Sequence, residues 1–128
     1  MAAIRVYICF DYDHDFDLKN LLVGQSKNAD SPFEIADWSI KEPSADWKDR
    51  ARARIRRVDQ VAVICGLSTD TAVGVNEEIR IARSEQKPYF LLAGRASGTN
   101  KKPTAANPSD KMYDWTWANL KTLIAGGR

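Results

Sequence analysis

Hydrophobic and polar positions along the chain follow two patterns, one typical of buried strands and the other of amphipathic helices. Apolar, β-branched runs occupy residues 4–10, 60–66 and 87–94, and a shorter run occupies 32–38. Such runs are expected of strands that are buried on both faces of a sheet. Apolar residues with helical spacing recur at about 15–25, 45–57, 73–86 and 116–125. The order is therefore strand, helix, strand, helix through most of the sequence.

Alternation of strands and helices predicts an α/β fold in which a parallel sheet is covered by helices on both faces. The segment KMYDW, after residue 110, adds a short edge strand. Residues 94–111 are rich in Gly, Pro, Ser, Thr, Asn and Lys, which predicts a long and mobile loop. With 128 residues, the chain is expected to form one domain spanning 1–128.

The predicted helix 73–86 carries two adjacent glutamates, Glu77 and Glu78. Its apolar stripe consists of Val75, Ile79 and Ala82, and neighbouring helical residues point about 100° apart. On this helical wheel Glu77 lies nearly opposite the stripe, whereas Glu78 lies about 60° from its centre. Glu77 is therefore expected to face water, and Glu78 to flank the core. An ion pair between Glu78 and Arg80 or Arg83 is the alternative to a functional role.

Ligands of open parallel sheets bind at the carboxyl ends of the strands, and the first such end is followed by four alternating aspartates. These are Asp11, Asp13, Asp15 and Asp17. As a calcium loop the segment lacks glycine at its sixth position and glutamate at its twelfth, so no metal site is expected. The simpler interpretation is that one aspartate caps the following helix and the others are solvated.

Charge and composition exclude several classes of function. A net charge of +2 does not by itself indicate nucleic acid or an anionic membrane as a partner. The arginines of helix 45–57 mostly describe its solvated face, with Ser44 as its N-cap. His14, the single histidine, has no paired nucleophile and is expected at the surface. Without an apolar stretch of about 18 residues or a signal-peptide core, the protein is expected in the cytoplasm.

Taken in order, the motifs ICFDYDHD, ADWS, VICGLST and VGVNEEI resemble the TIR-like domains of bacterial antiphage defence, in particular the small proteins related to the Thoeris TIR sensor. The resemblance runs from Ile4 to Leu123. It implies a flavodoxin-like three-layer sandwich with a central, mostly parallel five-stranded sheet. It also implies cleavage of the nicotinamide-ribose bond of NAD, with Glu78 in the position of the catalytic glutamate. NAD is then a substrate, and no cofactor is expected.

The resemblance further implies which residues bind the substrate. They belong to the loops that follow the first three strands: Phe10, Asp11, Tyr12, Asp37, Trp38, Ser39, Gly66 and Ser68. TIR enzymes commonly complete their site between subunits, so self-association through residues 38–46 is expected. For Phe10 and Trp38, ordinary core packing is an equally good interpretation.

Two classes of function remain open from the sequence. In the first, the protein is an NAD-cleaving enzyme that makes a cyclic ADP-ribose-type messenger for a separate effector protein. In the second, it is a TIR-type interaction module without catalysis. The surroundings of Glu78 distinguish the two: a carboxylate open to a pocket favours the enzyme, and one paired with arginine favours the module.

Overall fold

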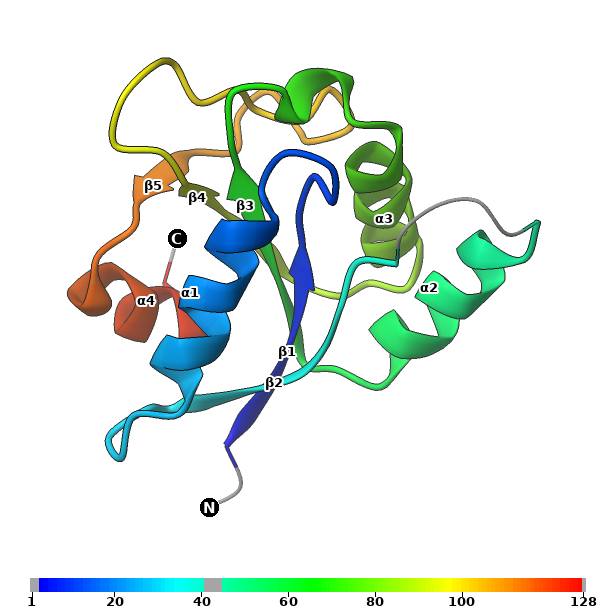
Figure 1. Cartoon of the computed structure of the whole chain (residues 1–128). Coiled ribbons are helices and arrows are strands. Elements are labelled where there is room, and N and C mark those ends of the chain that lie inside the picture. Colours follow the sequence, from blue (N-terminus) through cyan, green and yellow to red (C-terminus); the bar gives the residue numbers. More distant parts are fainter. Residues whose placement is uncertain (1–2, 41–44, 128) are drawn as a thin grey trace.

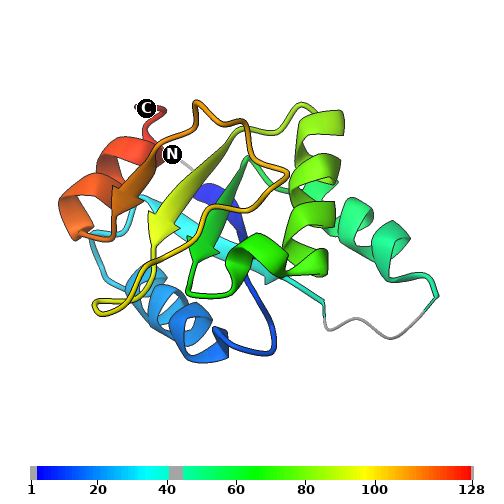
Figure 2. The same cartoon turned by 90° about the horizontal axis from the view of Figure 1, so that it is seen from above.

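The computed structural model describes residues 3–40 and 45–127. A central sheet separates two layers of helices, with α1 and α4 on one face and α2 and α3 on the other (Figures 1 and 2). The strands are β1 (Ile4–Cys9), β2 (Phe33–Trp38), β3 (Gln60–Cys65), β4 (Tyr89–Ala93) and β5 (Met112–Asp114). The helices are α1 (Phe16–Ser26), α2 (Trp47–Arg56), α3 (Val73–Ser84) and α4 (Trp117–Ile124).

The five strands are ordered β2-β1-β3-β4-β5, and all four neighbouring pairs are parallel. This is the predicted flavodoxin-like, five-stranded α/β fold. The weak run at 32–38 forms a full strand because it pairs with β1 from Ile4↔Phe33 to Ile8↔Trp38. Strand β2 lies on one side of β1, and β3 and the later strands lie on the other. The strand order therefore reverses between β1 and β3, and ligands of such sheets bind at the carboxyl ends of the strands at this point.

Side chains of successive strand residues point to opposite faces, so β1 contributes to two separate cores. Tyr7 and Cys9 pack with the apolar stripe of α3 and with α2, whereas Val6 and Ile8 pack with α1 and α4. Strand β3 is buried along its whole length, as expected for the central strand of a covered sheet. Cys9 and Cys65 are free and buried.

The sequence pattern predicts Phe16, Leu18, Leu21 and Leu22 as the apolar positions of α1, and the structure differs at two of them. Leu18 and Leu22 are buried, but Phe16 and Leu21 are exposed, and Lys19 is buried in their place. The Lys19 ammonium lies over two aromatic rings. It is 4.2 Å from the centroid of the Phe16 ring and 4.4 Å from the centroid of the Trp38 ring. Aromatic faces attract a cation and shield its stem from water, so a lysine occupies a position that the apolar pattern alone assigns to the surface.

Capping of α1 also differs from the prediction. Asp15 occupies the N-cap position, but its carboxylate makes no capping hydrogen bond. It turns inward instead and pairs with Arg95 at 3.1 Å. The predicted cap of α2, Ser44, lies outside the described residues.

Segment 94–111 crosses the carboxyl edge of the sheet (Figure 1). Its backbone is tied to neighbouring elements, since Lys101 N–H donates to the Gly66 carbonyl and Ala105 N–H donates to the Asn76 side chain. The mobility of this loop stays a prediction. No helix in the described part of the chain is both long enough and apolar enough to cross a membrane.

Candidate active site

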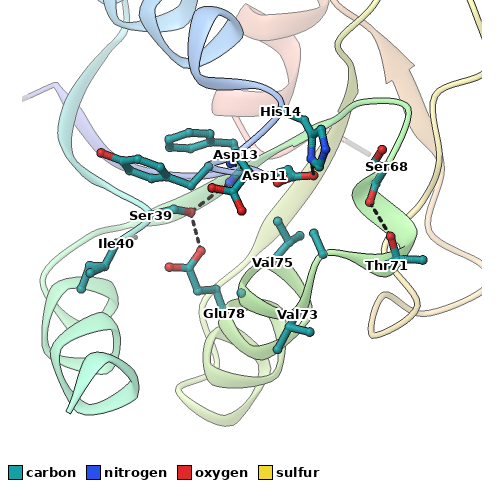
Figure 3. A pocket seen from close by; sticks show the side chains of 14 residues that line it. Asp11, Asp13, His14, Ser39, Ile40, Ser68, Thr71, Val73, Val75 and Glu78 are labelled. Carbon is teal, nitrogen blue, oxygen red and sulfur yellow. Dashed lines mark hydrogen bonds and ion pairs between the residues drawn. The ribbon is translucent and has the colours of Figure 1, made fainter. Parts of the chain in front are cut away.

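A pocket of about 300 Å³ lies at the carboxyl ends of β1 and β2, beside the first turn of α3. Five of the predicted substrate-binding residues line it together with Glu78: Phe10, Asp11, Tyr12, Ser39 and Ser68. The remaining lining residues were not predicted: Asp13, His14, Ile40, Thr71, Ala72, Val73, Gly74 and Val75. Figure 3 shows Glu78 pointing from α3 toward Ser39, with Asp11 and His14 across the pocket.

Glu78 is buried, with 1% of its surface exposed. Its Oε1 accepts a hydrogen bond from the Ser39 hydroxyl at 2.5 Å, and its Oε2 accepts one from the Tyr7 hydroxyl at 2.5 Å. The Cys9 thiol and the Ile40 N–H also donate to this carboxylate, and all four donors are uncharged. Neither of the two predicted arginines reaches it, because Arg80 pairs with Glu77 at 2.8 Å and Arg83 donates to the Ala105 carbonyl. The alternative of an ion pair with Arg80 or Arg83 is therefore wrong.

Burial raises the pKa of Glu78 to about 7, although the hydrogen bonds from Ser39 and Tyr7 favour the ionised form and act in the opposite direction. The pKa of Tyr7 is held well above its usual value, first by burial and then by the charge of Glu78. Tyr7 consequently stays protonated and remains a donor. Glu78 is thus a carboxyl group that changes its charge near neutral pH.

Glu77, the neighbouring residue, has the opposite surroundings. It is partly exposed, pairs with Arg80 at 2.8 Å and lies 3.8 Å from Lys48. It does not line the pocket. The helical wheel therefore separated the two glutamates correctly.

His14 is exposed, as predicted, but its Nδ1 pairs with Asp11 Oδ2 at 2.8 Å on the wall of the pocket. The hydrogen bond to Asp11 raises the pKa of His14. A second carboxylate, that of Asp13, also lines the pocket. Among the described residues, no group of three or more His, Cys, Asp or Glu side chains is arranged to hold a metal ion.

Three predicted substrate-binding residues do not line this pocket, each for a structural reason. Asp37 points to α2 and pairs with Arg54 at 3.0 Å. Trp38 is 36% exposed and packs against Lys19. A side chain at Gly66 would collide with the carboxylate of Asp15, so glycine is needed there for close packing. A role in substrate binding stays a prediction for all three.

Besides Asp13, His14 and Ile40, sequence reasoning missed Tyr7 and the segment from Thr71 to Val75, which leads into α3. The signal for Tyr7 was present, since a tyrosine inside a mostly apolar, buried strand must find a partner for its hydroxyl. What the sequence did not give was the identity of that partner, which lies 71 residues further along the chain. The turn from Thr71 to Val75 has no marked composition, and only its place beside β1 brings it to the pocket.

Comparison with known proteins identifies the family of the chain. Residues 7–97 match the family described as Thoeris protein ThsB, TIR-like domain. The chain belongs to that family. The matched region begins at Tyr7 and contains Ser39 and Glu78, and so it spans the whole pocket.

A solved structure described as the crystal structure of a prokaryotic SEFIR domain is similar to this Thoeris TIR-like domain, with a TM-score of 0.59. The alignment covers 96% of this chain and 91% of the SEFIR chain, at 17% sequence identity. This similarity supports the fold. No curated protein matches the sequence.

Proposed function

We propose that this Thoeris TIR-like domain is an NAD-cleaving enzyme that breaks the bond between nicotinamide and ribose. The observation that carries the proposal is the environment of Glu78. A buried carboxylate at the wall of a pocket accepts hydrogen bonds from two hydroxyl groups, and no arginine or lysine forms an ion pair with it among the described residues. Within residues 3–40 and 45–127, no cationic side chain is thus paired with its negative charge.

An uncompensated carboxylate suits the chemistry of nicotinamide loss. Nicotinamide leaves as a neutral molecule, and the ribose left behind develops positive charge in an oxocarbenium-like transition state. A fixed negative charge in a site shielded from water stabilises such a cation more than it stabilises the substrate. Since the pKa of Glu78 is about 7, a large fraction of the carboxyl is ionised at neutral pH.

One carboxylate of this kind restricts the substrates. The leaving group must depart without being protonated, so NAD and NADP are expected to react, and adenosine is not. Asp11 and Asp13 also line the pocket, but Asp11 is engaged by His14. Hydrolysis of adenosine would indicate that one of these aspartates acts as an acid, and would contradict a mechanism based on Glu78 alone.

The product is expected to be an ADP-ribose-type messenger for a separate effector protein. Once nicotinamide has left, the adenine ring or a ribose hydroxyl of the same molecule can capture the cation if water is excluded, which gives a cyclic product. Self-association through residues 38–46 is expected to complete the site. Part of that segment, 41–44, lies outside the described residues.

The test is release of nicotinamide from NAD by the purified chain, with product analysis, in dilute buffer, with a crowding agent and in phage-infected lysate. Crowding and lysate are included because both favour association of the chains, which is expected to complete the site. A site formed between chains gives a rate that rises faster than in proportion to the protein concentration. Glu78→Gln is the test variant. Glu77→Gln is the matched control, because the same chemical change is made one residue away and outside the pocket.

The second candidate is the interaction module, and one observation favours it: Glu78 is almost fully buried and both its oxygens are already bonded. Under this hypothesis the carboxylate is a structural group. Nicotinamide release in none of the three conditions, or equal release by the parent and Glu78→Gln, would favour the module over the enzyme.

A further inference from the structure

The two oxygens of Glu78 are held by donors on different sides. Ser39, which donates to Oε1, lines the pocket. Tyr7, which donates to Oε2, does not line it and is fully buried in the core between β1 and α3. Tyr7 therefore binds the carboxylate on its core side, and Ser39 binds it on its pocket side.

We propose that Tyr7 is a positioning residue, which fixes Oε2 of Glu78 so that Oε1 can exchange its bond with Ser39 for a bond to a ligand hydroxyl. This inference rests on the proposed function, because it assigns the roles of the two donors in the same reaction. Tyr7 touches no part of the pocket and acts only through Glu78.

Ser39 has a second acceptor available when it releases Glu78. Its Oγ lies 3.4 Å from the Ile8 carbonyl, and the same Oγ accepts a hydrogen bond from the Phe10 N–H at 3.0 Å. A hydroxyl proton turns about its C–O bond at little cost, so Ser39 can donate to Ile8 while a ligand donates to Oε1. No buried polar group is left unsatisfied by this exchange.

Tyr7 cannot exchange in this way. Its ring is packed among buried apolar residues such as Cys9 and Val75, and a close-packed core leaves no room for a second rotamer. Loss of its hydroxyl removes the 2.5 Å hydrogen bond to Oε2, and among the described donors Cys9 and the Ile40 N–H remain beside Ser39. A carboxylate with fewer donors is protonated more easily and turns more freely. The chemical step suffers, while the contacts that bind the substrate remain.

The experiment compares Tyr7→Phe with Ser39→Ala, and uses Tyr89→Phe as a control. Tyr89 also donates a hydrogen bond from its hydroxyl to a carboxylate, that of Asp110. It is the first residue of β4 and so lies at the amino ends of the strands, whereas the pocket lies at the carboxyl ends. We expect Tyr7→Phe to lower kcat by about 10- to 100-fold, as for loss of a hydrogen bond to a charged group, and to change KM by less than about threefold. Ser39→Ala is expected to lose less in kcat, and Tyr89→Phe to retain the parent values.

Equal losses of kcat in Tyr7→Phe and Ser39→Ala, or a loss in Tyr7→Phe that lies mainly in KM, would overturn the assignment. The pH profile provides a second readout. The midpoint of kcat/KM is expected to move upward by about 1 to 2 pH units in Tyr7→Phe, and an unmoved midpoint would also contradict the role.

A titration that needs no substrate separates this inference from the proposed function. In the parent chain labelled with ¹³C in Glu and Tyr, NMR should show the Glu78 carboxyl and the Tyr7 ring carbon that bears the hydroxyl moving with one shared midpoint. A Tyr7 resonance without that inflection overturns the inference even if NAD is cleaved, and even if Tyr7→Phe does not fold. Absence of NAD cleavage together with a shared midpoint would instead contradict the enzyme and leave the pairing established.

Discussion

Glu77 and Glu78 are adjacent in the chain but have opposite electrostatic surroundings. Glu78 is buried and accepts hydrogen bonds from two neutral hydroxyls, those of Ser39 and Tyr7. Glu77 is partly exposed and lies between the cations of Arg80 and Lys48. The helix turns by about 100° between the two residues, which places one carboxylate at the pocket and the other in a surface ion-pair network.

This asymmetry predicts different outcomes of the same substitution at the two positions. Glu78→Gln should lower NAD turnover by about 100-fold or more, because a neutral amide cannot stabilise a cationic sugar. Glu77→Gln should keep turnover within about twofold, since an exposed ion pair contributes little. Steady-state nicotinamide release measures both. Equal losses in the two variants would show that the position of the carboxylate at the pocket is not what matters.

The stability of the chain should depend on pH through Glu78. Its pKa is about 7 when folded, compared with 4.5 as the ordinary value, so the folded chain holds the proton more tightly. The resulting stabilisation is fully present below pH 4.5 and is lost as pH rises through 7. The difference in pKa corresponds to about 3 kcal/mol.

Glu78→Gln removes this titration and leaves the others in place. The free energy of unfolding of the parent, relative to the variant, is therefore expected to fall by about 3 kcal/mol between about pH 4 and about pH 8. Urea unfolding at the two pH values measures it. A difference between the two chains that stays constant with pH would mean that Glu78 titrates normally.

Activity should change with pH in the opposite sense from stability. The ionised form of Glu78 is the one that stabilises a cation, so kcat/KM is expected to rise with pH with a midpoint of about 7. Glu77→Gln should retain this midpoint. A rate that falls between pH 6 and pH 8 would indicate that the protonated carboxyl is the active form.

Trp38 should influence the product more than the fold. It is half-exposed at the end of β2 and covers the ammonium of Lys19. If its ring also holds the folded dinucleotide, Trp38→Ala shifts the product from cyclic toward linear ADP-ribose and slows the reaction. Trp47→Ala is a suitable control, because the Trp47 ring also lies near a lysine, with the Lys48 ammonium 5.9 Å from its centroid, but Trp47 begins α2 and does not stand at the carboxyl end of a strand. An unchanged product ratio in Trp38→Ala would remove Trp38 from the site.

Two glycines should respond to alanine with opposite signs. A methyl group at Gly66 would collide with the carboxylate of Asp15, so Gly66→Ala is expected to destabilise the chain by about 1 to 3 kcal/mol. At Gly24, inside α1, a methyl group meets nothing within 4 Å, and Gly24→Ala is expected to stabilise by about 0.5 to 1 kcal/mol. Thermal unfolding checks both. A neutral Gly66→Ala with lowered activity would favour a direct role for Gly66 in binding.

Periodicity in the sequence was sufficient for the order of the elements and for the fold class. Continuous apolar, β-branched runs indicated the strands, and apolar residues at helical spacing indicated the helices. The stripe Val75, Ile79 and Ala82 also decided which glutamate faces inward, because rotation along a helix is a local property. Recognition of the family came from the order of short motifs, not from any single one.

Only the tertiary structure decided which groups contact the carboxylate of Glu78. The partners of its carboxylate, Tyr7 and Ser39, lie 71 and 39 residues away, and no local pattern encodes a contact across β1, β2 and α3. The same holds for Lys19, which is buried because two aromatic rings from α1 and β2 converge on it. A sequence pattern reports which side of its own element a residue occupies, whereas charge state and hydrogen-bond partners depend on which elements the sheet brings side by side.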